Sequence, residues 1–227
     1  MNTRLIRRLM LASAVVFSVF LCANGDAAML YGGLRYYAND KTPLEVLTQR
    51  AKKRFNVASE EAILVIGQRR ERSAIPMLED IVANPSPPKA ILSKYPRNYE
   101  QVLIKGYRDS SLAAKMALAR MGVGNYFDEF VAGLSSTSVD WREDCGNALG
   151  YIGDKRAVKY LGPMLNQKEA PPKGPSHMNR SNASIAEDAL FDLMPEKYAA
   201  EKARRNNSPP PTEFWERWWE QNRAKYK

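Results

Sequence analysis

Residues 148–161 read ALGYIGDKRAVKYL, and this stretch decides the fold. Apolar side chains recur at helical spacing on both sides of its centre, first Trp141, Cys145, Ala148, Leu149 and Ile152, then Ala157, Val158, Leu161, Met164 and Leu165. Stripes with steps of three and four residues indicate amphipathic helices. Between them, Gly153 favours a left-handed helix end, and Asp154 can accept the free N–H groups that open the next helix. Two helices joined by so short a turn lie side by side, so the stretch predicts a helical hairpin.

The sequence predicts three more hairpins of the same kind. Their expected helix boundaries are Ser59 and Gly67, then Ser110 or Ser111 and Gly122, and finally Pro195, which can begin a helix at its first position. The corresponding positions in the four hairpins are Ile66, Met121, Ile152 and Leu193. The step from Met121 to Ile152 fits a bare helix pair, so the two longer steps contain insertions.

Residues 148–161 resemble a repeat of the HEAT-like family, in the subtype first associated with phycobilisome lyases. The resemblance extends over residues 58 to about 200 and is closest through the Gly153-Asp154 turn. The other repeats depart from the pattern, for example where Met194 replaces the glycine. The resemblance implies an all-α chain built as an α-solenoid of about four to five antiparallel helix pairs, a HEAT-like superhelix. It implies no particular activity, because the family consists mostly of binding scaffolds.

The segment 1–28 has the order of an export signal. Three arginines come first, an apolar run from Leu9 to Ala23 follows, and small residues then allow cleavage after Gly25, Ala27 or Ala28. A helix that crosses a bilayer needs about 20 apolar residues, so removal of the segment is favoured over a permanent anchor. We therefore expect a signal peptide at 1–28, an exported protein that is periplasmic or secreted, and no integral membrane segment after cleavage. A lipid-modified start at Cys22 is the weaker alternative, because bulky Leu21 precedes it.

Net charge and cysteine content bear on two different questions, the class of partner and the source of stability. Cleavage after Gly25 removes three arginines and no acid, which lowers the net charge from +9 to +6. An exported location makes nucleic acid an unexpected partner and favours an acidic protein, an anionic glycan or lipid head groups. Cys145 becomes the only cysteine, which excludes an internal disulfide, and its place on an apolar stripe predicts a core residue rather than a reactive thiol.

Two insertions, residues 84–98 and 166–182, both follow the second helix of a hairpin. In a stacked solenoid such connections lie on one edge, so we expect one rim. Residues 84–109 and 166–182 together carry a net charge of about +5. The candidate partner-binding residues of this rim are Lys89, Lys94, Arg97, Lys168, Lys173 and Arg180. The alternative interpretation is a pair of solvated loops, and residues 98–105 can form a short extra helix.

Signals for a catalytic, cofactor or metal site are absent from the sequence. His177 is the sole histidine, and a zinc site needs more imidazole or thiolate ligands than it can supply. Two acidic pairs, Glu143 with Asp144 and Glu187 with Asp188, are expected in the first turns of helices, where the helix dipole favours negative charge. There is no glycine-rich phosphate loop and no nucleophile elbow. We therefore expect a protein that is not an enzyme and holds no cofactor.

The C-terminal segment 208–227 carries three consecutive prolines and then an aromatic cluster of Phe214, Trp215, Trp218 and Trp219. The prolines break the preceding helix and Thr212 can cap the next one. An open solenoid end exposes apolar surface, so we expect a Trp-rich capping helix on the repeat domain of residues 29–207. The alternative is an aromatic docking helix, because tryptophans dominate interface energetics.

These patterns predict a non-catalytic exported scaffold that binds a protein partner. Two alternatives remain open: a bilin-lyase-like or chaperone-like factor, and a binder of anionic envelope polymers. The sequence does not indicate an oligomeric state.

Overall fold

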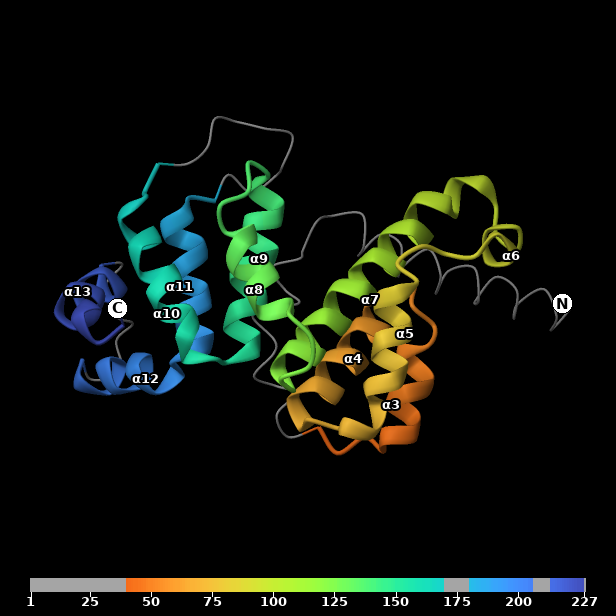
Figure 1. The fold of residues 1–227 in the computed structure, drawn as a ribbon, viewed down its shortest axis with the longest axis horizontal. Helices are drawn as coiled ribbons and strands as arrows, with labels where there is room; N and C mark the ends of the chain where they lie inside the picture. Colours follow the sequence, from red (N-terminus) through yellow and green to blue (C-terminus); the bar gives the residue numbers. More distant parts are fainter. Residues whose placement is uncertain (1–39, 170–179, 206–212, 227) are drawn as a thin grey trace, which may run out of the picture. The chain divides into compact units, whose positions relative to one another are not determined.

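The computed structural model describes residues 40–169, 180–205 and 213–226, and every regular element in these residues is a helix (Figure 1). The α-helices are α3 (Leu44–Ala51), α4 (Val57–Arg69), α5 (Ile75–Ala83), α6 (Lys89–Leu92), α7 (Glu100–Arg120), α8 (Tyr126–Gly133), α9 (Val139–Ile152), α10 (Val158–Leu161), α11 (Asn182–Leu193), α12 (Pro195–Arg204) and α13 (Phe214–Asn222). Short 3-10 helices accompany them: η2 (Arg72–Ala74), η3 (Arg97–Tyr99), η4 (Lys155–Ala157), η5 (Gly162–Asn166) and η6 (Arg223–Tyr226). The all-α prediction is confirmed for these residues. The predicted signal peptide, His177, Lys173 and Thr212 lie outside them.

The helices pack in a simple succession. Helix α4 contacts α7, α7 contacts α9, and α9 contacts α11, while α5, α8 and η5 pack against the next member of this series. The side chains between them form the core, and the largest that are fully buried include Ile63, Ile66, Leu118, Phe130, Leu149, Leu161 and Ile185. Cys145 is also fully buried, as its place on an apolar stripe predicts.

The hairpin predicted from residues 139–166 has the expected turn. Gly153 ends α9 in the left-handed region at φ 74°, and the Asp154 side chain accepts a hydrogen bond from the Arg156 N–H. The second limb differs from one continuous helix. It consists of η4, α10 and η5 in succession, and Pro163 stands in the first turn of η5. Proline lacks the N–H that an α-helix needs at that point, which accounts for the tighter turn there.

The first predicted hairpin has different helix ends from those expected. Asn56, not Ser59, caps α4 by accepting the Ser59 N–H, and Ser59 is buried inside the helix. Gly67 does not end α4, which continues to Arg69 and stops at Arg70 in the left-handed region. A Cβ at Gly67 would lie 2.6 Å from the Cβ of Ala117, so this glycine instead lets α4 approach α7 closely.

The second hairpin begins earlier than expected. Ser110 and Ser111 do not open a helix, because both are buried in the middle of α7. The short helix expected at residues 98–105 is instead the end of η3 followed by the beginning of that same 21-residue helix. Gly122 follows its end in the left-handed region at φ 74°, as predicted.

The aromatic C-terminal helix α13 packs on η5, in the second limb of the hairpin of residues 139–166. Trp215 and Trp219 are buried, and the Trp219 ring lies against the backbone of Gly162 in η5. Pro195 begins α12 in its first turn, as predicted. In the part of the chain that the structure describes, no helix has both the length and the apolar character needed to cross a bilayer.

Candidate binding surfaces

The first insertion is held at its base by Arg54. This residue lies in the left-handed region and is buried, and its guanidinium stacks 4.5 Å from the centre of the Tyr107 ring. Its Nη2 donates to the carbonyl of Ile81, at 2.8 Å, and to that of Asn84. These carbonyls belong to the end of α5, where intrahelical donors are missing. Arg54 therefore fixes the point from which the insertion departs.

The insertion is folded rather than an open loop. It contains α6 and η3, and the ring of Tyr95 lies 6.3 Å from that of Phe55, which follows α3. On the other side, a Cβ at Gly106 of α7 would lie 2.8 Å from the Cα of Phe55, so α7 also packs closely on this connection. These contacts give the insertion a defined surface.

Three of the six rim cations stand on this folded insertion. Lys89, Lys94 and Arg97 are exposed and form no ion pair with any other residue that the structure describes. Two apolar side chains near them in the sequence are also exposed: Tyr95 is 40% exposed and Val102, at the start of α7, is 38% exposed. We call these five residues the basic face.

Two rim cations of the second insertion, Lys168 and Arg180, have structural partners. Lys168 lies 2.8 Å from a Glu216 carboxylate oxygen, and so ties the end of η5 to α13. Arg180 lies 2.8 Å from Glu143 of α9 and also pairs with Asp188 of α11. Its side chain is only 16% exposed, so Arg180 bridges two packed helices and offers little surface to a partner. Of the five predicted rim cations that the structure describes, Lys168 and Arg180 thus form ion pairs within the fold, whereas Lys89, Lys94 and Arg97 form none with other described residues.

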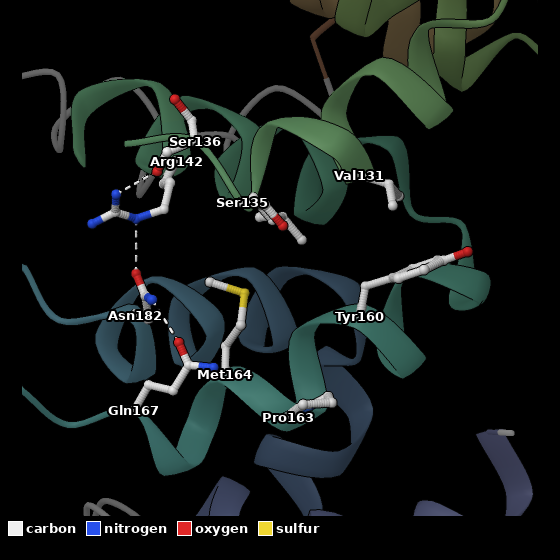
Figure 2. A pocket seen from close by; sticks show the side chains of 10 residues that line it. Val131, Ser135, Ser136, Arg142, Tyr160, Pro163, Met164, Gln167 and Asn182 are labelled. Carbon is white, nitrogen blue, oxygen red and sulfur yellow. Dashed lines mark hydrogen bonds between the residues drawn. The ribbon is translucent and has the colours of Figure 1, made fainter. Parts of the chain in front are cut away.

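A groove lies beside the second insertion (Figure 2). Residues from the end of α8 and the start of α9 form one wall, and residues of α10, η5 and the start of α11 form the other. Its volume is about 470 Å³, within the range of roughly 300–1,000 Å³ usual for ligand sites. The lining residues are Val131, Leu134, Ser135, Ser136, Arg142, Tyr160, Pro163, Met164, Gln167 and Asn182.

Hydrogen bonds hold the polar end of the groove in place. Arg142 donates from Nη1 to the Ser136 carbonyl at 2.6 Å and from Nε to Asn182 Oδ1 at 2.9 Å. Asn182 Nδ2 donates in turn to Gln167 Oε1 at 2.6 Å. No sequence pattern indicates this groove, because its walls come from separate segments of the chain and its polar side chains follow no motif.

Sequence reasoning also missed an acidic cluster where α4, α7 and α9 meet. Burial, the nearby Asp109 and Glu61 raise the pKa of Glu60 to about 8, against a lowering effect of Lys105. Burial likewise raises the pKa of Asp144 to about 7, with Asp109 the next contribution. The prediction that Glu143, Asp144, Glu187 and Asp188 lie in the first turns of helices is wrong, because α9 begins at Val139 and α11 begins at Asn182. The sequence does contain a signal for the burial of these two acids. The spacing of Glu60 from Ile63 and of Asp144 from Ala148 places each acid on the buried face of its helix.

The other candidate features are the Cys145 thiol and possible metal ligands. Burial raises the pKa of the Cys145 thiol to about 12, so little of the reactive thiolate forms at neutral pH. Among the described residues, no group of three or more histidine, cysteine, aspartate or glutamate side chains is placed to hold a metal ion. Comparison of the chain with protein-family models, with curated proteins and with solved structures finds no match.

Proposed function

We propose that this chain is a non-catalytic, exported α-solenoid scaffold that binds an acidic protein through the basic face. The observation that carries the proposal is that Lys89, Lys94 and Arg97 lack ion-pair partners among the described residues, although they stand on a folded and anchored insertion. Cations without internal partners on a fixed surface can pair with a partner's carboxylates at little ordering cost.

The solenoid part of the proposal is supported by the order of the helix contacts. Each first helix of a hairpin packs on the first helix of the next, through α4, α7, α9 and α11. This nearest-neighbour order is the one a repeat protein needs, because a single helix pair cannot bury its own apolar face. The resemblance of residues 148–161 to a HEAT-like repeat points the same way.

The mixture of side chains on the basic face favours a protein as the partner. Tyr95 and Val102, which lie close to these cations in the sequence, expose apolar surface. A purely polyanionic partner would gain little from that surface, whereas protein interfaces are enriched in tyrosine and arginine and combine an apolar centre with a polar rim. We therefore expect the partner to offer both carboxylates and an apolar patch.

Charge reversal on the basic face tests the proposal. The triple variant Lys89→Glu, Lys94→Glu and Arg97→Glu is compared with a control variant carrying the same charge change elsewhere, Lys197→Glu, Lys202→Glu and Arg205→Glu. The control residues are exposed on or just after α12 and form no ion pair with other described residues. Each mature protein is crosslinked in an envelope extract, and the adducts are quantified by mass spectrometry.

We expect the basic-face variant to lose its main adduct and the control to keep it. The adduct should also weaken as salt rises, because exposed charge pairs are screened beyond about 10 Å at 0.1 M. Equal recovery with all three proteins would refute the basic face as the binding surface. Equal loss with both variants would refute it too, since it would show attachment to anionic envelope polymers by overall charge.

A further inference from the structure

We propose that the groove of Figure 2 binds the C-terminal residues of a protein chain, with the terminal carboxylate at Arg142 and an apolar side chain toward Tyr160. This second binding site does not depend on the basic face. It is built by different elements, from the end of α8 to the start of α11.

Arg142 gives the groove its charge preference. It is the only charged side chain among the described residues that line the groove. Two of its nitrogens are fixed by Ser136 and Asn182, while no described residue pairs with its Nη2. Figure 2 shows the guanidinium at one end of the groove, held against the start of α11. A cation already fixed in position loses little conformational freedom when it binds an anion, and arginine matches the geometry of a carboxylate.

Polar groups near Arg142 fit a carboxylate and the peptide group before it. Gln167 uses its Oε1 to accept from Asn182, which leaves the Nε2 hydrogens of the same amide as donors. The exposed hydroxyl of Ser135 lies on the opposite wall (Figure 2). An extended segment between the walls would therefore meet donors at one end.

The other end of the groove is apolar. Val131 and Tyr160 lie there, and the Met164 side chain is directed into the space between the walls, between the polar side chains and Tyr160 (Figure 2). Tyr160 is 38% exposed, and the Lys159 ammonium lies 4.8 Å from the centre of its ring, so only part of this aromatic surface is open to a ligand. A terminal residue carries its carboxylate and its side chain on the same Cα, so a C-terminal Leu or Phe can place the carboxylate at Arg142 and direct its side chain along the groove, in one cavity of about 470 Å³.

A pair of matched peptides tests this assignment without altering the protein. The probes are acetyl-Ala-Leu-Ala-Leu as the free acid and as the C-terminal amide, titrated into ¹⁵N-labelled mature protein and followed by NMR. We expect the acid to shift signals of residues 131–142 and 160–167 and to bind at least about tenfold more tightly than the amide, the usual effect of one charge-assisted hydrogen bond. Equal affinities of acid and amide, or no shifts at millimolar peptide, would overturn the proposal.

Two variants locate the binding on the protein. Arg142→Gln should remove the difference between acid and amide, and Tyr160→Ala should weaken both peptides by a similar factor while keeping the difference. Lys197→Ala on α12 is the control and should leave both affinities unchanged, because this exposed lysine belongs to neither the groove nor the basic face. Because Arg142 also joins two segments, thermal unfolding of each variant is measured alongside. If Arg142→Gln folds poorly, Tyr160→Ala decides, and unchanged peptide affinity in that variant would refute the groove as the site.

Discussion

Replacement of Glu60 by Gln should make the protein more stable at alkaline pH and leave its stability almost unchanged at acid pH. Burial and the neighbouring Asp109 raise the pKa of the Glu60 carboxyl from an ordinary value near 4.5 to about 8. Each tenfold change in acid dissociation corresponds to about 1.4 kcal/mol, so ionised Glu60 costs the folded state up to about 5 kcal/mol. Local relaxation and water penetration reduce such penalties, and we expect a measured effect of about 2–3 kcal/mol.

The pH window follows from the direction of this shift. Below about pH 4, Glu60 is neutral in the folded and the unfolded chain, so its contribution to stability is complete. Between about pH 4 and 8 only the unfolded chain releases the proton, so stability falls as pH rises. Above pH 8 both states are ionised and the loss is complete. Asp144, whose pKa is raised to about 7, adds a loss in the same direction.

Urea unfolding at pH 5.0 and pH 8.5 measures the effect. Glutamine has the shape of a neutral glutamic acid, so at pH 5.0, where the loss has only begun, the free energies of unfolding of the variant and the parent should differ by less than about 1 kcal/mol. At pH 8.5 the variant should be the more stable. Glu79→Gln is the matched control, because Glu79 is exposed on α5 and the substitution changes the net charge equally. A Glu60→Gln effect no larger at pH 8.5 than at pH 5.0, or equal to that of the control, would refute the reasoning.

Three further substitutions test the contacts described above. Gly67→Ala should destabilise the fold by about 1–3 kcal/mol, because the added Cβ would lie 2.6 Å from that of Ala117; an unchanged urea midpoint would contradict the close approach of α4 and α7. Tyr151→Phe should cost about 1 kcal/mol through loss of the 2.6 Å hydrogen bond to the Leu64 carbonyl, and calorimetry showing equal stability would argue against it. Arg54→Ala should leave the end of α5 unpaired, so amide exchange should accelerate in residues 84–98 before the rest of the chain unfolds. Uniform exchange rates would show that the insertion does not depend on this arginine.

The parts of the fold that the sequence predicts are those with local causes. Gly153 and Asp154 each determine one turn through their own backbone or side chain, and both have the predicted role. The errors come from residues whose role depends on distant neighbours. Glycine is typical of a helix end, but at Gly67 the missing side chain instead lets Ala117 of α7 pack close to α4. Ala117 lies much later in the sequence.

Buried serines produced a second kind of error. Ser110 and Ser111 were expected as helix caps because serine usually competes with the helix backbone. Inside α7 they instead occupy positions where a small side chain fits against packed neighbours, and no local pattern distinguishes the two uses.

The candidate sites were predictable only in part. The sequence pattern predicted that Lys89, Lys94 and Arg97 stand on an insertion, and the structure shows that this insertion contains the helices α6 and η3. The pairing of Arg180 with Glu143 joins residues 37 positions apart and could not be inferred from spacing. The groove is less predictable still, because its lining depends on how two hairpins meet.

The second insertion leaves and re-enters the helical body at nearly the same point. The Ala183 N–H donates to the Gln167 carbonyl at 3.1 Å, and the side chains of Asn182 and Gln167 are joined as well. With both ends tied, extra residues placed between 169 and 180 need not alter the register of η5 or α11, and loop-closure entropy rises only slowly with length. This stretch therefore offers a place to graft an epitope tag or a fluorophore, from which the whole scaffold can be followed in the cell while its helices stay as they are.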